Sequence, residues 1–161
     1  MKFYTAEEYL PKVLSIFEHV SRELKETLNN FELEHIGSSA IHGAISKGDL
    51  DILVKVSASS FEEALEKIKT LGFYEKQGTL RTACLCMLST DRFNHDVAIQ
   101  LIVKNSEFEM FVEFKDKLNQ NPRLVDEYNL LKQNSIDLTP EDYRKKKSLF
   151  IDSVLNGSKK Y

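Results

Sequence analysis

The spacing of apolar residues predicts a chain that begins and ends in helices and carries its strands between them. Over residues 5–28, apolar side chains recur every three or four positions, as in an amphipathic helix. Thr5 and Glu8 fit a capping box at its start, whereas Pro11 lies too late for a first turn, so we expect a kink or a restart there. A second helix is predicted over residues 61–71, closed by Gly72.

Short apolar runs in the middle of the chain predict strands. A small helical connection separates the first two runs. A polar link over residues 90–95 joins the last two, which are predicted to form a hairpin. The third run is expected to be a short strand or a turn. The five segments are residues 33–36, 50–54, 73–78, 79–89 and 96–103.

After Asn105 the pattern is helical to the end of the chain. Three helices are predicted, over residues 106–120, 122–134 and 139–156, with Pro122 and Pro140 in first turns, where proline is tolerated. The predicted fold class is α+β, a small mixed β-sheet of four to five strands backed by helices on one side. We expect one domain over residues 1–161, with a sheet-bearing core at about 30–104 and C-terminal helices at about 105–156.

Composition is that of an ordinary globular protein, with 42% hydrophobic and 29% charged residues in a chain of 161. A net charge of -3 argues against a nucleic acid partner, because binding to a phosphate backbone needs a basic surface. The chain has no apolar run long enough to span a membrane and no apolar signal segment at its start. We therefore expect a cytoplasmic protein with no membrane contact.

The two cysteines, Cys84 and Cys86, fall in the run predicted as a strand over residues 79–89. Side chains two apart in a strand share a face, but their separation is long for a disulfide. A structural zinc site would need a second pair of ligands. We interpret both cysteines as small buried residues.

The candidate chemistry lies between residues 35 and 52. Gly37 and Ser38 form a small-residue turn whose backbone N–H groups can bind phosphate oxygens. Asp49 and Asp51 are two apart in a predicted strand, so their carboxylates point together and can share a hard cation. Asp-x-Asp pairs and Gly-Ser turns are each common on solvated surfaces, and it is their combination at this spacing that favours a site.

This pattern resembles the signature of the DNA polymerase beta-like nucleotidyltransferase superfamily, and within it the GrpB-like (UPF0157) family. The resemblance holds without gaps over residues 37–52 and continues over 96–118 and in two later Tyr-x-x-x-Lys segments that end at Lys132 and Lys147. The chain departs from the family pattern at three positions: His42 stands in place of proline, Ala44 in place of leucine and Lys115 in place of arginine. None of these departures removes a carboxylate.

The resemblance implies a third acid on a later strand, and it favours Asp96, with Gln100 as a polar neighbour on the same face. If the two strands pair, Asp49, Asp51 and Asp96 would be the catalytic and metal-binding residues. The alternative is that Asp96 only ends a hairpin turn.

Further side chains are candidates for holding the nucleotide. Besides Gly37 and Ser38 they are Ser39, Lys47, Arg81, Gln100 and Lys147. Lys132 lies on the same helix face as Tyr128, which suits either stacking and phosphate contact or a packed tyrosine beside an exposed lysine.

The predicted function is a metal-dependent nucleotidyltransferase. It would use Mg²⁺ or Mn²⁺ and a nucleoside triphosphate, in the first instance ATP, to modify an unknown small-molecule or protein acceptor. The alternative is a nucleotide-binding or regulatory module of the same fold without transfer activity. A hydrolase using the same acids, and an interaction protein whose acids are surface residues, are also open. The sequence leaves the acceptor, the preferred base and the oligomeric state undetermined.

Overall fold

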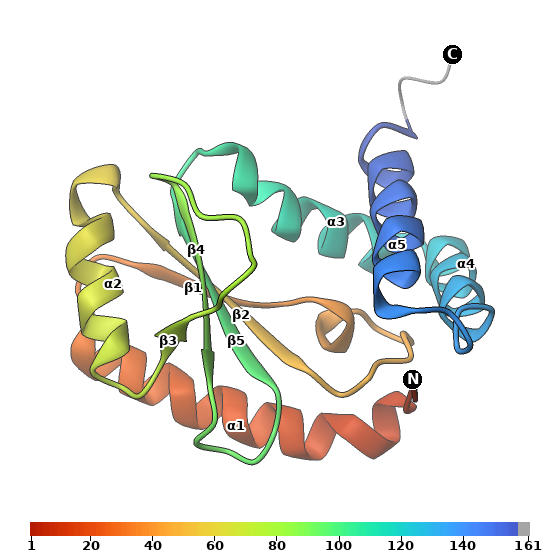
Figure 1. Cartoon of the computed structure of the whole chain (residues 1–161), viewed down its shortest axis with the longest axis horizontal. Coiled ribbons are helices and arrows are strands. Elements are labelled where there is room, and N and C mark those ends of the chain that lie inside the picture. The colour runs from red at the N-terminus through yellow and green to blue at the C-terminus, as the bar shows by residue number, and fades with distance from the viewer. Residues whose placement is uncertain (158–161) are drawn as a thin grey trace.

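A five-stranded mixed sheet organises the chain in a computed structural model, which describes residues 1–157 (Figure 1). Its strands are β1 (Glu32–Ile36), β2 (Leu50–Val56), β3 (Tyr74–Glu75), β4 (Leu85–Thr90) and β5 (Val97–Val103). Their order in the sheet is β1-β2-β5-β4-β3. β2 and β5 run parallel, and every other neighbouring pair is antiparallel. The predicted α+β class and mixed sheet are confirmed.

Helix α1 (Ala6–Thr27) begins as the sequence predicts. The backbone N–H of Thr5 donates to Glu8 Oε2 at 2.7 Å, which is the reciprocal half of a capping box. The helix continues through Pro11 without a break, so the expected restart does not occur. Its buried stripe is continuous from Tyr9 to Leu24.

The strand predicted over residues 79–89 is wrong in its first half. Residues 79–84 form a loop, and β4 begins only at Leu85. Thr82 explains the difference, because its Oγ1 accepts a hydrogen bond from Cys84 N at 3.0 Å and so favours a local turn over a strand ladder. Cys84 therefore lies in the loop and is half-buried, while Cys86 is buried in β4, and both are free thiols.

Helices α1 and α2 (Phe61–Lys69) cover one face of the sheet and bury its largest apolar cluster. Alternate residues of β2 and β5 supply that core, including Ile52 and Ile99. The sheet is thus backed by helices on one side as predicted. Part of the opposite face is covered as well, by Phe108 and the start of α3 (Met110–Asn119).

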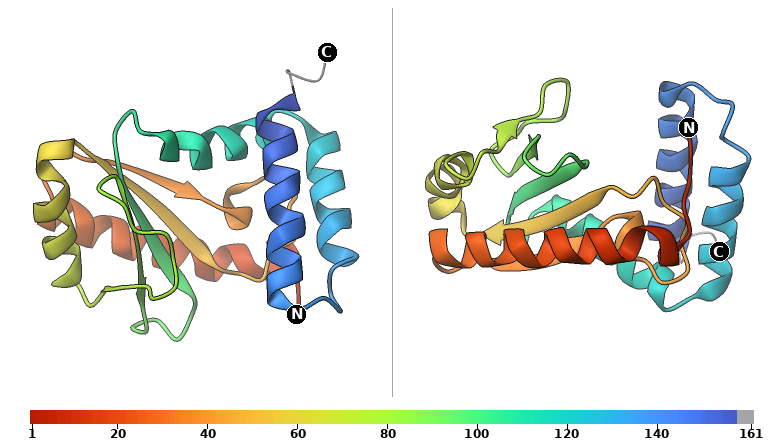
Figure 2. Two further views of the ribbon diagram at one scale, coloured as in Figure 1. Left: turned by 45° about the horizontal axis from the view of Figure 1, so that its top comes forward. Right: turned by 90° about the horizontal axis from the view of Figure 1, so that it is seen from below.

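Helices α4 (Pro122–Gln133) and α5 (Pro140–Leu155) stand beside α3 at one end of the sheet (Figures 1 and 2). They bury a second apolar cluster, in which Phe114 and Tyr128 meet Ile41 from the β1–β2 connection. Both helices start with proline in the first turn, as predicted, and Thr139 caps α5 by accepting from Asp142 N. This cluster fixes the three C-terminal helices against the connection that carries the Gly-Ser turn.

Within residues 1–157, no helix combines the length and the apolar character needed to cross a membrane.

Candidate functional site

The acids lie where β2 and β5 begin, at the same edge of the sheet. Asp49 immediately precedes β2, and Asp51 is its second residue. Asp96 immediately precedes β5, and its carbonyl accepts a hydrogen bond from Leu50 N at 2.9 Å. Because Leu50 pairs with Val97 in the core under α1, alternation turns Asp49, Asp51 and Asp96 to the opposite face.

Burial and the neighbouring negative charges both raise the pKa of two of these carboxyls. Burial raises the pKa of Asp49, and the charge of Asp96 raises it further, while Lys47 and Lys147 lower it. Burial also raises the pKa of Asp51, which Lys147 lowers and Asp49 raises. A cation placed between these acids would relieve both effects.

Asp96 stands slightly apart from the pair. Its side chain is exposed and lines an open polar cavity with Asp49, Lys47 and His95. In the described part of the chain, no group of three or more acidic, histidine or cysteine side chains is placed to hold a metal ion. The structure therefore brings together a two-carboxylate pair with a third acid at its margin.

Gly37 allows the turn after β1 to approach Asp51 closely. Its φ is +77°, and a Cβ built there would lie 2.5 Å from Asp51 Oδ2. No other residue fits this position without moving the carboxylate. The turn continues into a short 3₁₀-helix (Ser38–Ala40), whose first residue reaches the lysines described next.

Lys132 is buried, whereas the sequence left open whether this lysine contacts phosphate or is exposed beside a packed tyrosine. Its side chain is 1% exposed, and its Nζ donates to Ser38 Oγ at 2.8 Å and to the carbonyl of Ile45 at 2.5 Å. It also lies 3.9 Å from the centre of the Tyr128 ring. Burial, reinforced by the charges of Lys147 and Lys47, lowers the pKa of Lys132 to about 7. A buried amine without a carboxylate partner is suited to receiving an anion.

Two further lysines share this corner. The neighbouring Tyr128 has the largest effect on the pKa of Lys147 and raises it. Burial lowers this pKa, and Tyr143 and Asp51 raise it further. Lys47 Nζ lies 5.3 Å from the centre of the Tyr143 ring. Together they enclose a small cavity, which we call the phosphate seat, of about 50 Å³, whose polar lining is Ser38, Ser46, Lys47, Asp49, Asp51, Lys132, Tyr143 and Lys147.

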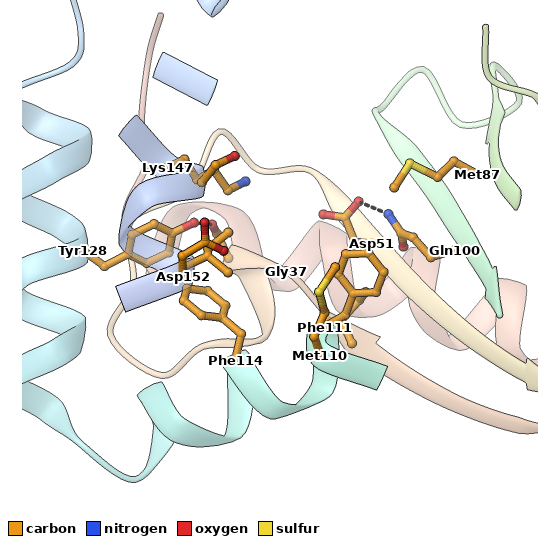
Figure 3. A pocket seen from close by; sticks show the side chains of 14 residues that line it. Gly37, Asp51, Met87, Gln100, Met110, Phe111, Phe114, Tyr128, Lys147 and Asp152 are labelled. Atoms are coloured by element: carbon orange, nitrogen blue, oxygen red, sulfur yellow. Dashed lines mark hydrogen bonds between the residues drawn. The ribbon is translucent and has the colours of Figure 1, made fainter. Parts of the chain in front are cut away.

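A larger cavity of about 400 Å³ opens beside the seat and shares Ser38, Asp51 and Lys147 with it (Figure 3). Its remaining lining is mostly apolar and comes from the sheet, from the turn at Gly37 and from α3, α4 and α5. Gln100, on β5, donates from Nε2 to Asp51 Oδ1 at 3.4 Å. Gln100 Oε1 is buried and has no hydrogen-bond partner in residues 1–157.

Two of the predicted nucleotide-binding residues lie elsewhere. Arg81 stacks on Phe61 and donates to Glu75 Oε1 at 3.1 Å, on the face of the sheet that carries α2. The expectation rested on the misplaced strand, since a loop aims Arg81 away from the acids. Ser39 is buried, and its Oγ lies 2.8 Å from His35 Nε2, so its hydroxyl braces β1 and does not face the phosphate seat.

Of the residues that the C-terminal helices contribute to the two cavities, only Lys147 was predicted from the sequence to bind the nucleotide, and the role of the Tyr128–Lys132 pair was left open. Tyr128 Oη lies 3.3 Å from Ser38 Oγ, and Tyr143 lines the phosphate seat. Met110 and Phe111 of α3 line the larger cavity. The Tyr-x-x-x-Lys spacing was a visible signal for the first two. Nothing in the local pattern of α3 separates its cavity-lining residues from core residues.

Comparison with known proteins finds relatives over nearly the whole chain. A family model described as GrpB protein matches residues 5–157. A UPF0157 protein of Vibrio cholerae serotype O1 is 47% identical over 155 residues, which cover 96% of this chain and 82% of that protein.

Solved structures share the fold. The conserved protein GrpB from Enterococcus faecalis superimposes with a TM-score of 0.69 at 20% identity, over 94% of this chain and 98% of that one. The Cid1 poly(U) polymerase, in a structure with MgGTP bound, superimposes with a TM-score of 0.60 at 15% identity. That match covers 83% of this chain and 44% of the polymerase, and it shows a nucleotidyltransferase-like fold.

Proposed function

The chain belongs to the GrpB family, and from that premise we propose that it is a metal-dependent nucleotidyltransferase. It would move a nucleoside monophosphate from a nucleoside triphosphate, such as ATP, to a small-molecule or protein acceptor. One observation carries the proposal: Asp49 and Asp51 line a small cavity that three lysines and Ser38 also line. Paired carboxylates and clustered amines at one place suit a ligand that brings both a divalent cation and phosphates.

The phosphate seat would hold the terminal phosphates. Lys132 and Lys147 supply positive charge from buried and half-buried positions, where it is least screened by water. Ser38 Oγ is already oriented by Lys132, and Gly37 keeps the turn against Asp51. Lys47, exposed at the mouth, would add a further contact.

The acids fit Mg²⁺ or Mn²⁺ by their chemistry. Carboxylate oxygens are the preferred ligands of Mg²⁺, which is commonly held by one or two carboxylates together with substrate phosphates. Burial raises the pKa of Asp49 and Asp51 although Lys147 is near both, so a divalent cation beside them would stabilise their charged forms. When bound, the ion would neutralise charge on the phosphates and help to orient them.

The transfer step itself is a displacement at the α-phosphorus. An acceptor hydroxyl oxygen forms the new P–O bond, the bond to pyrophosphate breaks, and the phosphate seat retains the leaving group. Asp96 would orient the hydroxyl and take its proton, which an exposed carboxylate can pass on to water.

An acceptor other than nucleic acid suits the charge of the protein. The net charge is -3, and Asp91 and Asp96 lie in the polar cavity beside Asp49. These carboxylates would repel a phosphate backbone approaching the site.

One observation favours the second candidate, a nucleotide-binding module without transfer activity. The described residues offer a carboxylate pair instead of a three-acid cluster, because Asp96 lies at the margin. This candidate would bind magnesium and nucleotide equally well and release no pyrophosphate.

Calorimetric titration with ATP and magnesium tests the shared part of both candidates. We expect binding to the wild-type protein and loss of at least tenfold in affinity for Asp49→Asn and Asp51→Asn. Asp126→Asn, at an exposed position on α4, is the matched control and should bind as the wild type does. Equal affinity in all four proteins would refute the site, and pyrophosphate release against an acceptor panel would separate the two candidates.

A further inference from the structure

The larger cavity has an apolar end that the phosphates would not use. Figure 3 shows Asp51 between Lys147 on one side and Gln100 and Met87 on the other. We call this far end the methionine cavity and define it by Met87, Gln100, Met110 and Phe111. It contributes thioethers, an aromatic ring and one amide, and no charged side chain.

Gln100 gives this cavity a defined polar edge. Its Nε2 donates to Asp51, which fixes the orientation of the amide and leaves Oε1 as an acceptor. That oxygen is buried without a partner in the part of the chain that the structure describes. Buried polar atoms are nearly always hydrogen-bonded, so a ligand N–H is a natural partner for it.

We infer that the methionine cavity binds the nucleobase of the nucleoside triphosphate, and that Gln100 Oε1 accepts a hydrogen bond from a base N–H. The assignment of the nucleoside to a triphosphate rests on the proposed function. Thioethers and an aromatic side chain suit the faces of a flat ring, and a single acceptor suits its polar edge. Asp51 lines both the phosphate seat and the larger cavity of which the methionine cavity is one end, so a ligand can extend from one into the other.

The order of the strands indicates that the acceptor would approach the site from another side. Ser38 follows β1, Asp49 precedes β2 and Asp96 precedes β5, and these strands are neighbours in that order. With pyrophosphate leaving toward Ser38, an in-line acceptor enters from the Asp96 side. The methionine cavity shares no lining residue with the polar cavity that Asp96 lines, and so it remains free for the base.

Methionine methyl resonances test the inference directly. The chain has three methionines, of which Met87 and Met110 line the cavity, and Met1, which does not line it, is the internal control. In a protein labelled with [methyl-¹³C]methionine, we expect adenosine, uridine or both to shift the Met87 and Met110 signals saturably and to leave Met1 unmoved. Purine riboside and 3-methyluridine, which lack the relevant donor, should bind roughly tenfold more weakly than their parents.

A pair of glutamine variants assigns this discrimination to one atom. Gln100→Leu should remove the preference for the donor-bearing nucleoside, and Gln77→Leu, in an exposed loop, should retain it. Unmoved Met87 and Met110 signals with all four ribonucleosides would overturn the inference. So would shifts caused by the aromatic alcohol tyrosol but by no nucleoside, because the cavity would then be an acceptor chamber.

Failure of the base site can be distinguished from failure of the proposed function. Nucleosides carry no phosphate, so their binding does not depend on the phosphate seat. If adenosine shifts the methyl signals and a non-hydrolysable ATP analogue with magnesium binds no more tightly, the phosphate seat fails and the base site stands. If that analogue and tripolyphosphate bind equally well with unmoved methyl signals, the base site fails and the seat stands.

Discussion

Replacing Lys132 by methionine should make the protein more stable at neutral pH and weaken its binding of phosphates. The substitution keeps the length and apolar stem of the side chain and removes its amine. Lys132 is only 1% exposed, and its amine has only Ser38 Oγ and the Ile45 carbonyl as acceptors within residues 1–157. None of the ion pairs within residues 1–157 includes Lys132, so no carboxylate within 4 Å compensates its charge.

The magnitude follows from the pKa. Lowering the pKa of Lys132 from 10.5 to about 7 corresponds to about 5 kcal/mol of cost in burying the charged form. Removing the amine leaves the Ile45 carbonyl without its donor, which costs about 1–3 kcal/mol, while Ser38 keeps Tyr128 at 3.3 Å. The net gain in free energy of unfolding for Lys132→Met is therefore about 2–4 kcal/mol below pH 7.

The sign of the pH dependence distinguishes this account from simple repacking. Between pH 7 and 10.5 the unfolded chain binds more protons at this lysine than the folded chain, so the free energy of unfolding rises with pH. Below pH 7 the lysine is charged in both states and the full cost is present. The advantage of Lys132→Met should accordingly be large at pH 6 and be gone by pH 10, where the cost in the wild type has fallen to about 1 kcal/mol and the unpaired Ile45 carbonyl makes the variant equally or less stable.

Urea denaturation at pH 6 and pH 10 measures both quantities, and tripolyphosphate titration measures the loss of anion binding. Lys146→Met, at an exposed position on α5, is the matched control and should change neither. A Lys132→Met protein that is less stable than the wild type at pH 6 would refute the reasoning. A stability difference that stays constant with pH would refute it equally.

Three further substitutions test other parts of the site. Asp51→Asn should raise the melting temperature at pH 7, because it removes a buried carboxylate with a raised pKa, and the gain should shrink as the pH falls toward 3.8; calorimetry over that range checks it. Gly37→Ala should cost about 1–3 kcal/mol more than Gly78→Ala in urea denaturation, because both have positive φ but only Gly37 has Asp51 in the way. Arg81→Gln should leave magnesium-dependent ATP binding unchanged in calorimetry, and a tenfold loss would contradict its placement on the α2 face.

Local signals were sufficient wherever one segment determines its own structure. The capping residue Thr5, Pro122 at a helix start and the alternation that puts Asp49 and Asp51 on one face depend on neighbours within a few positions. The strand predicted over residues 79–89 failed by the same rule. A side chain of Thr82 competes locally with the ladder, and the apolar pattern does not reveal it.

The site depended on contacts between distant segments, which periodicity does not encode. The spacing of Tyr128 and Lys132 on one helix face was evident, but their burial is not. It arises because α4 packs its aromatic face against Phe114 of the preceding helix and against Ile41, which is far away in the sequence. Arg81 failed for the converse reason, since an isolated charge in an apolar run carries no information about which face of the sheet it reaches.

The electrostatics of this corner argue that it is built for a ligand of mixed charge. Burial pushes Asp49 and Asp51 toward their neutral forms and pushes Lys132 toward its neutral form, although a direct ion pair would oppose both tendencies. Among residues 1–157, none of the ion pairs joins these acids to this lysine. A fold selected for stability alone would pair or replace such groups, because each unpaired buried charge destabilises the folded state. A divalent cation with a polyphosphate supplies both missing charges at once. The same groups that weaken the empty protein would therefore give it affinity for that ligand.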